Sequence, residues 1–153
     1  MSAGPAASRL PPALGAYPRT RRAGDWIYVS GLSARLADGS IDGVSRLPGR
    51  SVHRDAGVQT RRVLCHLAEV LQAAGARLAD CVDITVFLTD RADFDVYNQV
   101  YAEHFAQDGP ARTTVVVRGL PHADMVVEMK AVAWCGPRPG AQAGAAMEAG
   151  HAG

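Results

Sequence analysis

Two segments have the spacing of amphipathic helices, whereas four have the short β-branched runs typical of strands, and this imbalance limits the folds open to the chain. Segment 53–74 has apolar residues every three or four positions and ends at Gly75, and segment 93–105 has the same pattern and is followed by Gly109 and Pro110. The predicted strands are 26–31, 81–88, 112–118 and 125–134. This order predicts an α+β fold with a mixed sheet and two helices on one face.

No predicted element of the chain packs against the second face of this sheet. Since the chain offers no third helix, another subunit is the expected cover, and we expect a homo-oligomer. The last two strands are expected to pair as a hairpin through GLPHAD, residues 119–124. Residues 36–49 carry DGS, IDG and LPG, which predict a surface loop or a short hairpin.

The two ends differ in composition from the middle of the chain. The 153 residues are enough for one domain, which we assign to residues 13–135. Residues 1–12 are rich in Ala, Pro and Ser, and residues 136–153 are mostly small. Both ends carry too little apolar surface to offset the entropy of ordering them, so we expect a flexible N-terminal segment and a flexible C-terminal tail.

Charge and hydropathy exclude two classes of partner. The 16 Lys and Arg residues nearly balance the 15 Asp and Glu residues, so no large field is available to hold a nucleic acid. No run of 18 apolar residues exists, and the N-terminus lacks the basic and apolar regions of a signal peptide. We therefore expect a cytoplasmic protein without nucleic-acid or membrane partners.

The cysteines and histidines show no metal-binding spacing. Cys65, Cys81 and Cys135 are widely spaced and form no CxxC pair, and the five histidines form no HxxxH or HExxH pattern. We expect no metal site, and we expect the cysteines to be reduced, buried and non-catalytic.

Arg112 and Glu128 are the first candidates for chemistry. Arg112 opens one predicted strand, and Glu128 lies in the middle of the strand expected to pair with it. A surface ion pair, which contributes up to ~1 kcal/mol, would explain both residues. The alternative is an anion-binding arginine beside a carboxylate that activates water.

Other polar residues are less distinctive by themselves. Tyr97 on the apolar stripe of the second helix is typical of a core residue, and Asn98 beside it is typical of a solvated face. Arg35 and His122 lie in predicted loops, where binding sites are often built. Tyr17 precedes a cluster of arginines that is too small to bind nucleic acid.

Six pieces of sequence, taken in order, resemble the Rid (YjgF-like) family of enamine and imine deaminases. They are GDWIYVSG, QTRRVLCHLAEVLQAAGARLADCVDITVFLTD, FDVYNQVYAEHF, GPARTTVVV, LP and VEMKAVA. The resemblance covers residues 17–134. It implies a chorismate-mutase-like sandwich, a homotrimer with clefts between neighbouring subunits, a small-molecule substrate and no cofactor.

The resemblance also assigns roles to individual residues. It implies that Arg112 binds a substrate carboxylate and that Glu128 positions the attacking water, so these two are the expected catalytic residues. The expected substrate-binding residues are Tyr17, Ser30, Gly31, Arg35, Tyr97, Asn98, Thr114 and His122. The chain departs from many members at Leu32, where they have Gln, and at Thr114, where they have Cys.

Within the family, SGLSAR, DGSIDGV, YNQVY, ARTTV and LPH are most similar to the 2-aminomuconate deaminases. This similarity implies hydrolysis of 2-aminomuconate to the 2-keto or 2-hydroxy diacid and ammonia, with Arg35 as the expected partner of the second carboxylate and His122 as its alternative. Two other functions remain open. One is a general deaminase of 2-aminoacrylate-type enamines and imines, and the other is a non-enzymatic, ligand-binding or chaperone-like trimer.

Overall fold

The first helix shows how this sequence builds its core. A computed structural model describes residues 10–105 and 107–137, and in it α1 spans Ala56–Ala73. Asp55 caps the helix by accepting a hydrogen bond from the backbone N–H of Val58 at 2.9 Å, and Gly75 ends it with a φ of 82°. The side chains buried along one stripe of α1 include Val63, Leu64, Leu67 and Leu71, each fully enclosed.

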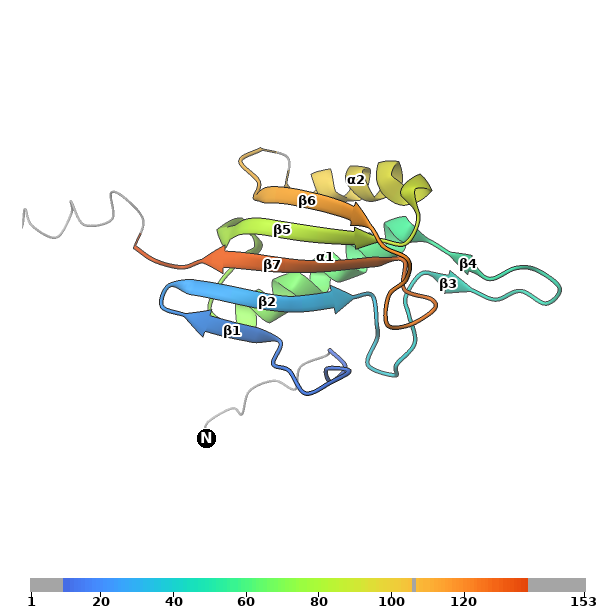
Figure 1. Cartoon of the computed structure of the whole chain (residues 1–153), viewed down its shortest axis with the longest axis horizontal. Coiled ribbons are helices and arrows are strands. Elements are labelled where there is room, and N and C mark those ends of the chain that lie inside the picture. Colours follow the sequence, from blue (N-terminus) through green and yellow to red (C-terminus); the bar gives the residue numbers. More distant parts are fainter. Residues whose placement is uncertain (1–9, 106, 138–153) are drawn as a thin grey trace, which may run out of the picture.

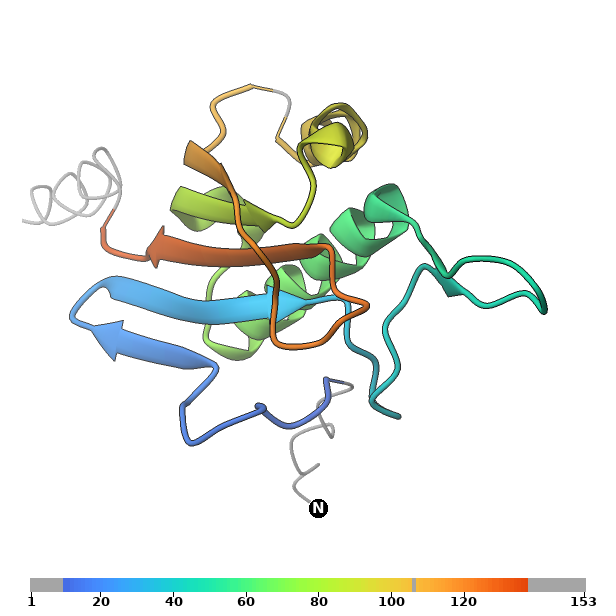
Figure 2. The same cartoon turned by 45° about the vertical axis from the view of Figure 1, so that its right-hand side comes forward.

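A five-stranded sheet lies against this stripe. Its strands, in spatial order, are β1 (Thr20–Ala23), β2 (Trp26–Ser33), β7 (Val127–Trp134), β5 (Cys81–Leu88) and β6 (Ala111–Val116). The second helix, α2, spans Phe94–Ala102, and short 3-10 turns, η1 (Leu78–Asp80) and η2 (Arg91–Asp93), precede β5 and α2. Figures 1 and 2 show both helices on the same face of the sheet, which confirms the predicted α+β arrangement.

The expected hairpin between the last two strands is wrong. β6 pairs parallel with β5, whereas β7 lies between β2 and β5 and pairs antiparallel with both. The cause is the helix between β5 and β6, because a strand–helix–strand crossover places its two strands parallel. Residues 119–124 are therefore not a hairpin turn, and they return the chain across β5 to the middle of the sheet.

The remaining boundaries differ in smaller ways. α1 begins at Ala56 rather than near residue 53, because β4 (His53–Arg54) pairs with β3 (Val44–Ser45) in a short hairpin that Figure 1 shows projecting from the body. α2 ends at Ala102, before the stop signals at Gly109 and Pro110. Residues 1–9 and 138–153, most of the two ends expected to be flexible, lie outside the described residues.

Gln59 ties the returning segment to α1. Its side chain is fully buried, its amide N–H donates to the carbonyl of Asp124 at 2.8 Å, and its amide oxygen accepts from the backbone N–H of Val126 at 2.9 Å. These two bonds satisfy buried backbone groups in the segment that connects β6 to β7, where no neighbouring strand can pair with them. Gln59 therefore holds the start of the strand that carries Glu128.

Replacing Gln59 with Leu is expected to lower the free energy of unfolding by about 2–4 kcal/mol, because two buried backbone groups lose their partners. Urea denaturation of the two proteins measures the difference. Gln72→Leu, the same change at an exposed position of α1, is the control and is expected to stay within about 0.5 kcal/mol of the wild type. Equal stabilities for all three proteins would contradict this role of Gln59.

Candidate active site

Arg112 lies over a platform of two tyrosines. Its guanidinium carbon is 5.3 Å from the ring centroid of Tyr97 and 4.6 Å from that of Tyr101, and one N–H donates to the side-chain oxygen of Asn98 at 2.9 Å. The hydroxyl of Tyr97 hydrogen-bonds that of Thr114 on the same strand as Arg112. Stacking and one hydrogen bond orient the guanidinium and leave further N–H groups to hold an anion.

The spacing of α2 builds this platform. Phe94, Tyr97, Tyr101 and Phe105 recur every three or four residues, and neighbouring rings in the series lie 4.7–6.2 Å apart. Tyr101 has the spacing of a core residue on the same apolar stripe as Tyr97, and nothing else in the sequence indicates its contact with Arg112. Burial raises the pKa of Tyr101 to about 12, so this hydroxyl stays protonated at neutral pH.

Glu128 lies on the other face of the sheet. Val127 and Met129 on either side of it point into the core and are fully buried, so Glu128 points away from the helices. It is paired in register with Ser33 of β2, next to a β-bulge that places one extra residue between Val29 and Leu32. The bulge brings Ser30 and Gly31 beside the carboxylate, a common device near functional sites.

Close contact and burial set the chemistry of this carboxyl group. A Cβ atom on Gly31 would lie 2.3 Å from Oε1 of Glu128, so any other residue there would force the carboxylate to move. Burial raises the pKa of Glu128 above its usual value of 4.5. A carboxylate of raised pKa takes up a proton more readily, which suits it to remove one from water.

Replacing Gly31 with Ala is expected to lower catalytic efficiency about 10²-fold, because the new methyl group displaces the carboxylate of Glu128 from its position. Gly119→Ala is the matched control, since a Cβ there meets no atom within 4 Å. Initial rates of both variants, with circular dichroism to check folding, make the comparison. Wild-type rates for Gly31→Ala would contradict the importance of this close approach.

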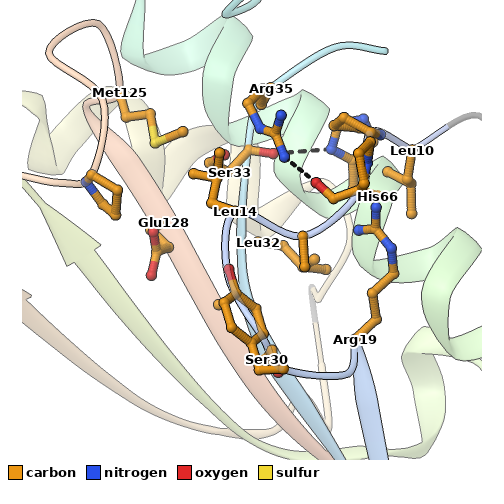
Figure 3. Close-up of a pocket in the computed structure, with 16 residues that line it drawn as sticks. Leu10, Leu14, Arg19, Ser30, Leu32, Ser33, Arg35, His66, Met125 and Glu128 are labelled. Carbon is orange, nitrogen blue, oxygen red and sulfur yellow. Dashed lines mark hydrogen bonds between the residues drawn. The ribbon is translucent and has the colours of Figure 1, made fainter. Parts of the chain in front are cut away.

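A cavity of about 330 Å³ opens beside Glu128. Tyr17, Ser30, Gly31 and Arg35 line it, as do Arg19 and residues 10–14. Figure 3 shows Leu14, Arg19, Ser30 and Arg35 around the opening. The hydroxyl of Ser30 donates to the carbonyl of Pro18 at 2.7 Å, which fixes the segment that carries Tyr17. Arg35 donates to the carbonyl of Pro12, so the N-terminal segment is attached to the cavity wall.

The expected site residues therefore form two groups within one chain. Arg112, Asn98, Tyr97 and Thr114 gather between β6 and α2, whereas Tyr17, Ser30, Gly31, Arg35 and Glu128 gather around the cavity. The surface ion pair between Arg112 and Glu128 is excluded, because β5 separates their strands and their side chains point to opposite faces. Neither group alone holds both Arg112 and Glu128, the two expected catalytic residues.

His122 belongs to neither group. Its Nδ1 accepts a hydrogen bond from the backbone N–H of Asp124 at 3.1 Å, and its ring lines a separate hollow with Arg54, Asp93 and Arg118. Asp124 is buried and ion-paired with Arg46 and Arg54. The ion pairs of Asp124 therefore anchor the β3–β4 hairpin to the loop that precedes β7.

The cysteines are free, but their burial differs from the expectation. Cys81 is buried, Cys135 is half-buried and Cys65 is exposed, because position 65 of α1 turns away from the core stripe. Burial raises the pKa of the Cys81 thiol to about 12, which leaves it protonated and unreactive. Within the described residues, no three His, Cys, Asp or Glu side chains are grouped so that they could hold a metal ion, and no helix combines the length and hydropathy needed to cross a membrane.

Comparison with known proteins gives a family match over most of the chain. Residues 7–135 match the family model described as endoribonuclease L-PSP. The 3-aminoacrylate deaminase RutC of Acinetobacter baylyi is 37% identical over 123 residues, which is 80% of this chain and 90% of that protein. The 2-iminobutanoate/2-iminopropanoate deaminase of Rattus norvegicus is 32% identical over 130 residues, 85% of this chain and 88% of that protein.

Solved structures agree with these sequence matches. Escherichia coli TdcF, crystallised with bound serine, is 29% identical and has a TM-score of 0.69, with 82% of this chain and 93% of that chain covered. The Rid-family protein YyfA of Yersinia pestis is 30% identical, with a TM-score of 0.70 over 82% and 93% of the two chains. The fold and the sequence therefore lead to the same set of relatives.

Proposed function

The chain belongs to the endoribonuclease L-PSP family, which includes RutC and reactive intermediate deaminase proteins, and from this membership we propose that it is a hydrolytic deaminase of enamines and imines. The observation that carries the proposal is the pair of residue groups described above. One presents an oriented arginine that can hold a carboxylate, and the other presents a carboxyl group of raised pKa in a cavity. The family description names an endoribonuclease, but a net charge of +1 supplies little field for a polyanion.

The proposed reaction needs only an anchored substrate and an activated water. The enamine first tautomerises to the imine as a proton moves from nitrogen to carbon. Glu128 then takes a proton from water as the oxygen attacks the imine carbon, and the C=N electron pair moves to nitrogen, which takes up a proton. Finally the hydroxyl group gives up its proton and the amine takes up a second one, so that the C–N bond breaks, ammonia leaves and the carbonyl forms. Glu128 supplies general base catalysis, and Arg112 orients the substrate carboxylate.

We further propose that one active site is built from two copies of the chain, in a homotrimer. Arg112 of one copy and Glu128 of its neighbour would then face the same substrate, since within one copy they point to opposite faces of the sheet. Trp26, Tyr28 and Val115 support this arrangement. They lie on the face without helices and are 42%, 49% and 39% exposed, an apolar surface suited to contact with another copy.

The finer proposal is that the substrate is the dicarboxylate 2-aminomuconate. A second carboxylate buried without a partner would cost several kcal/mol, so the site needs a second cation. Arg35 meets this need better than His122, because Arg35 lines the cavity that contains Glu128 whereas His122 lines the other hollow. The charge of an arginine also does not change near neutral pH.

Ammonia release from a panel of substrates tests the proposal. Enamines and imines with one and with two carboxylates, 2-aminomuconate among them, are supplied to the wild-type protein. Turnover of the whole panel with a preference for 2-aminomuconate supports the finer proposal, and turnover of monocarboxylic substrates alone leaves the general deaminase. Ligand binding without any ammonia release would replace the enzyme by a ligand-binding trimer.

A further inference from the structure

Arg19 and Arg35 lie together at one end of the cavity. Both line it, and Figure 3 shows them on the side opposite Glu128, with His66 between them. Arg19 directly precedes β1, and Arg35 lies two residues after β2. Two residues that are 16 positions apart in the chain thus bring two positive charges to one wall of the same pocket as the proposed base.

These two arginines lack the partners that similar arginines have. Four described arginines are half-buried, and two of them, Arg54 and Arg62, form ion pairs with Asp124 and Asp42 at 3.0 and 2.7 Å. Arg19 and Arg35 form no ion pair with any carboxylate in the described part of the chain. Half-buried charges without a counter-ion are costly, and two like charges side by side raise that cost.

The electrostatics of Arg19 agree with this geometry. Burial and the neighbouring charge of Arg35 lower the pKa of Arg19. Among the described residues, the guanidinium of Arg35 donates to one neutral acceptor, the carbonyl of Pro12, which uses one of its five N–H groups. His66 adds no positive charge, because burial lowers the pKa of its ring, whose Nδ1–H donates to the carbonyl of Ser33 at 2.9 Å. Two guanidinium groups therefore remain available to an anion in the cavity.

We propose that Arg19 and Arg35 together form an anion subsite that holds the distal carboxylate of a dicarboxylic substrate while its reacting end lies at Glu128. This inference rests on the proposed function and extends it, because it makes Arg19 a specificity-determining residue. Paired guanidinium groups hold a carboxylate with several charge-assisted hydrogen bonds. Residues 10–14 line the same cavity, and the hydrogen bond from Arg35 to the carbonyl of Pro12 holds them next to this subsite.

Binding of two unreactive ligands tests the subsite without any need for turnover. trans,trans-Muconate and sorbate have the same six-carbon diene, but muconate carries a carboxylate at both ends and sorbate at one. Isothermal titration calorimetry on the full-length wild type is expected to give a Kd for muconate at least about 10-fold below that for sorbate. Arg19→Gln and Arg35→Gln should each weaken muconate binding about 5- to 10-fold and change sorbate binding less than about twofold.

Arg50→Gln is the charge-matched control, since Arg50 is exposed and lines neither pocket. It is expected to bind both ligands as the wild type does, and thermal melting checks that every variant is folded. No preference for muconate in the wild type, or equal losses for both ligands in Arg19→Gln, would overturn the subsite. Inorganic phosphate that binds more tightly than muconate, in a manner dependent on Arg19, would replace the distal carboxylate by a phosphate group.

The outcomes separate this subsite from the proposed activity. Selective binding of muconate without ammonia release from any enamine would overturn the deaminase and leave the dicarboxylate subsite standing. Ammonia release from monocarboxylic enamines, with no selectivity for muconate, would leave the deaminase and overturn the subsite.

Discussion

Replacing Glu128 with Gln is expected to lower kcat about 10²- to 10⁴-fold, the usual contribution of a positioned acid or base. Glutamine has the same shape and fits beside Gly31, but its amide cannot take a proton from water. Binding at Arg112 is unaffected, so KM should change far less than kcat. Ammonia release from an enamine substrate measures both constants, and Glu103→Gln, the same change at a surface position, is the control and should keep wild-type rates.

The pH profile supplies an independent readout of the same residue. Because burial raises the pKa of Glu128, the acid limb of kcat/KM in the wild type should have its midpoint above 4.5, the usual value for Glu. This limb should disappear in Glu128→Gln. A variant that keeps both the rate and the acid limb of the wild type would remove Glu128 from the mechanism.

The same substitution should raise stability at neutral pH. The pKa of Glu128 is higher in the folded than in the unfolded chain, so the folded state binds more protons between the two pKa values and loses stability as pH rises through them. Glutamine stays neutral and avoids this loss. The Tm of Glu128→Gln should therefore match that of the wild type near pH 4 and exceed it at pH 7, an exchange of activity for stability that is common at active sites.

Local patterns in the sequence predicted the elements but not their order in the sheet. β5 has the predicted bounds, and α1 ends at the predicted glycine, because β-branched runs and helix stops act over a few residues. The pairing of β6 depends on a crossover through α2, and the hydrophobic runs of β6 and β7 fit a hairpin equally well. The strand–helix–strand order was the available signal for parallel pairing. β1 was missed because Thr20–Ala23 is short and polar.

The site was predictable only as far as residues could be matched to the family. Arg112 and Asn98 are 14 positions apart, and nothing in their spacing indicates the hydrogen bond that joins them. Tyr101 has the same helical spacing as a core residue, and Arg19 belongs to a run of arginines whose other members, Arg21 and Arg22, are exposed. Distinguishing site residues from core or surface residues of the same type requires knowing which face each one occupies, and tertiary packing decides that.

Arg112→Ala is expected to lower kcat/KM about 10²-fold, since the substrate loses charge-assisted hydrogen bonds to its carboxylate. Arg112→Lys should recover little of this loss. An ammonium group cannot reproduce the planar contact with the two tyrosines, and it cannot bind a carboxylate through two parallel hydrogen bonds. Light scattering should give about three times 16.1 kDa for each variant, as for the wild type. A monomer of wild-type activity would contradict the shared site.

Mixing two inactive variants gives the sharpest test of a site shared between copies. If Arg112 of one copy acts with Glu128 of its neighbour, an oligomer containing both Arg112→Ala and Glu128→Gln chains has some sites in which both residues are intact. Random assembly at equal amounts should restore about one quarter of the wild-type sites, because each intact residue is present with a chance of about one half. Co-refolding the two variants and assaying ammonia release measures the recovery, and each variant refolded alone is the control. If both residues came from the same chain, every site would lack one of them and mixing would restore nothing.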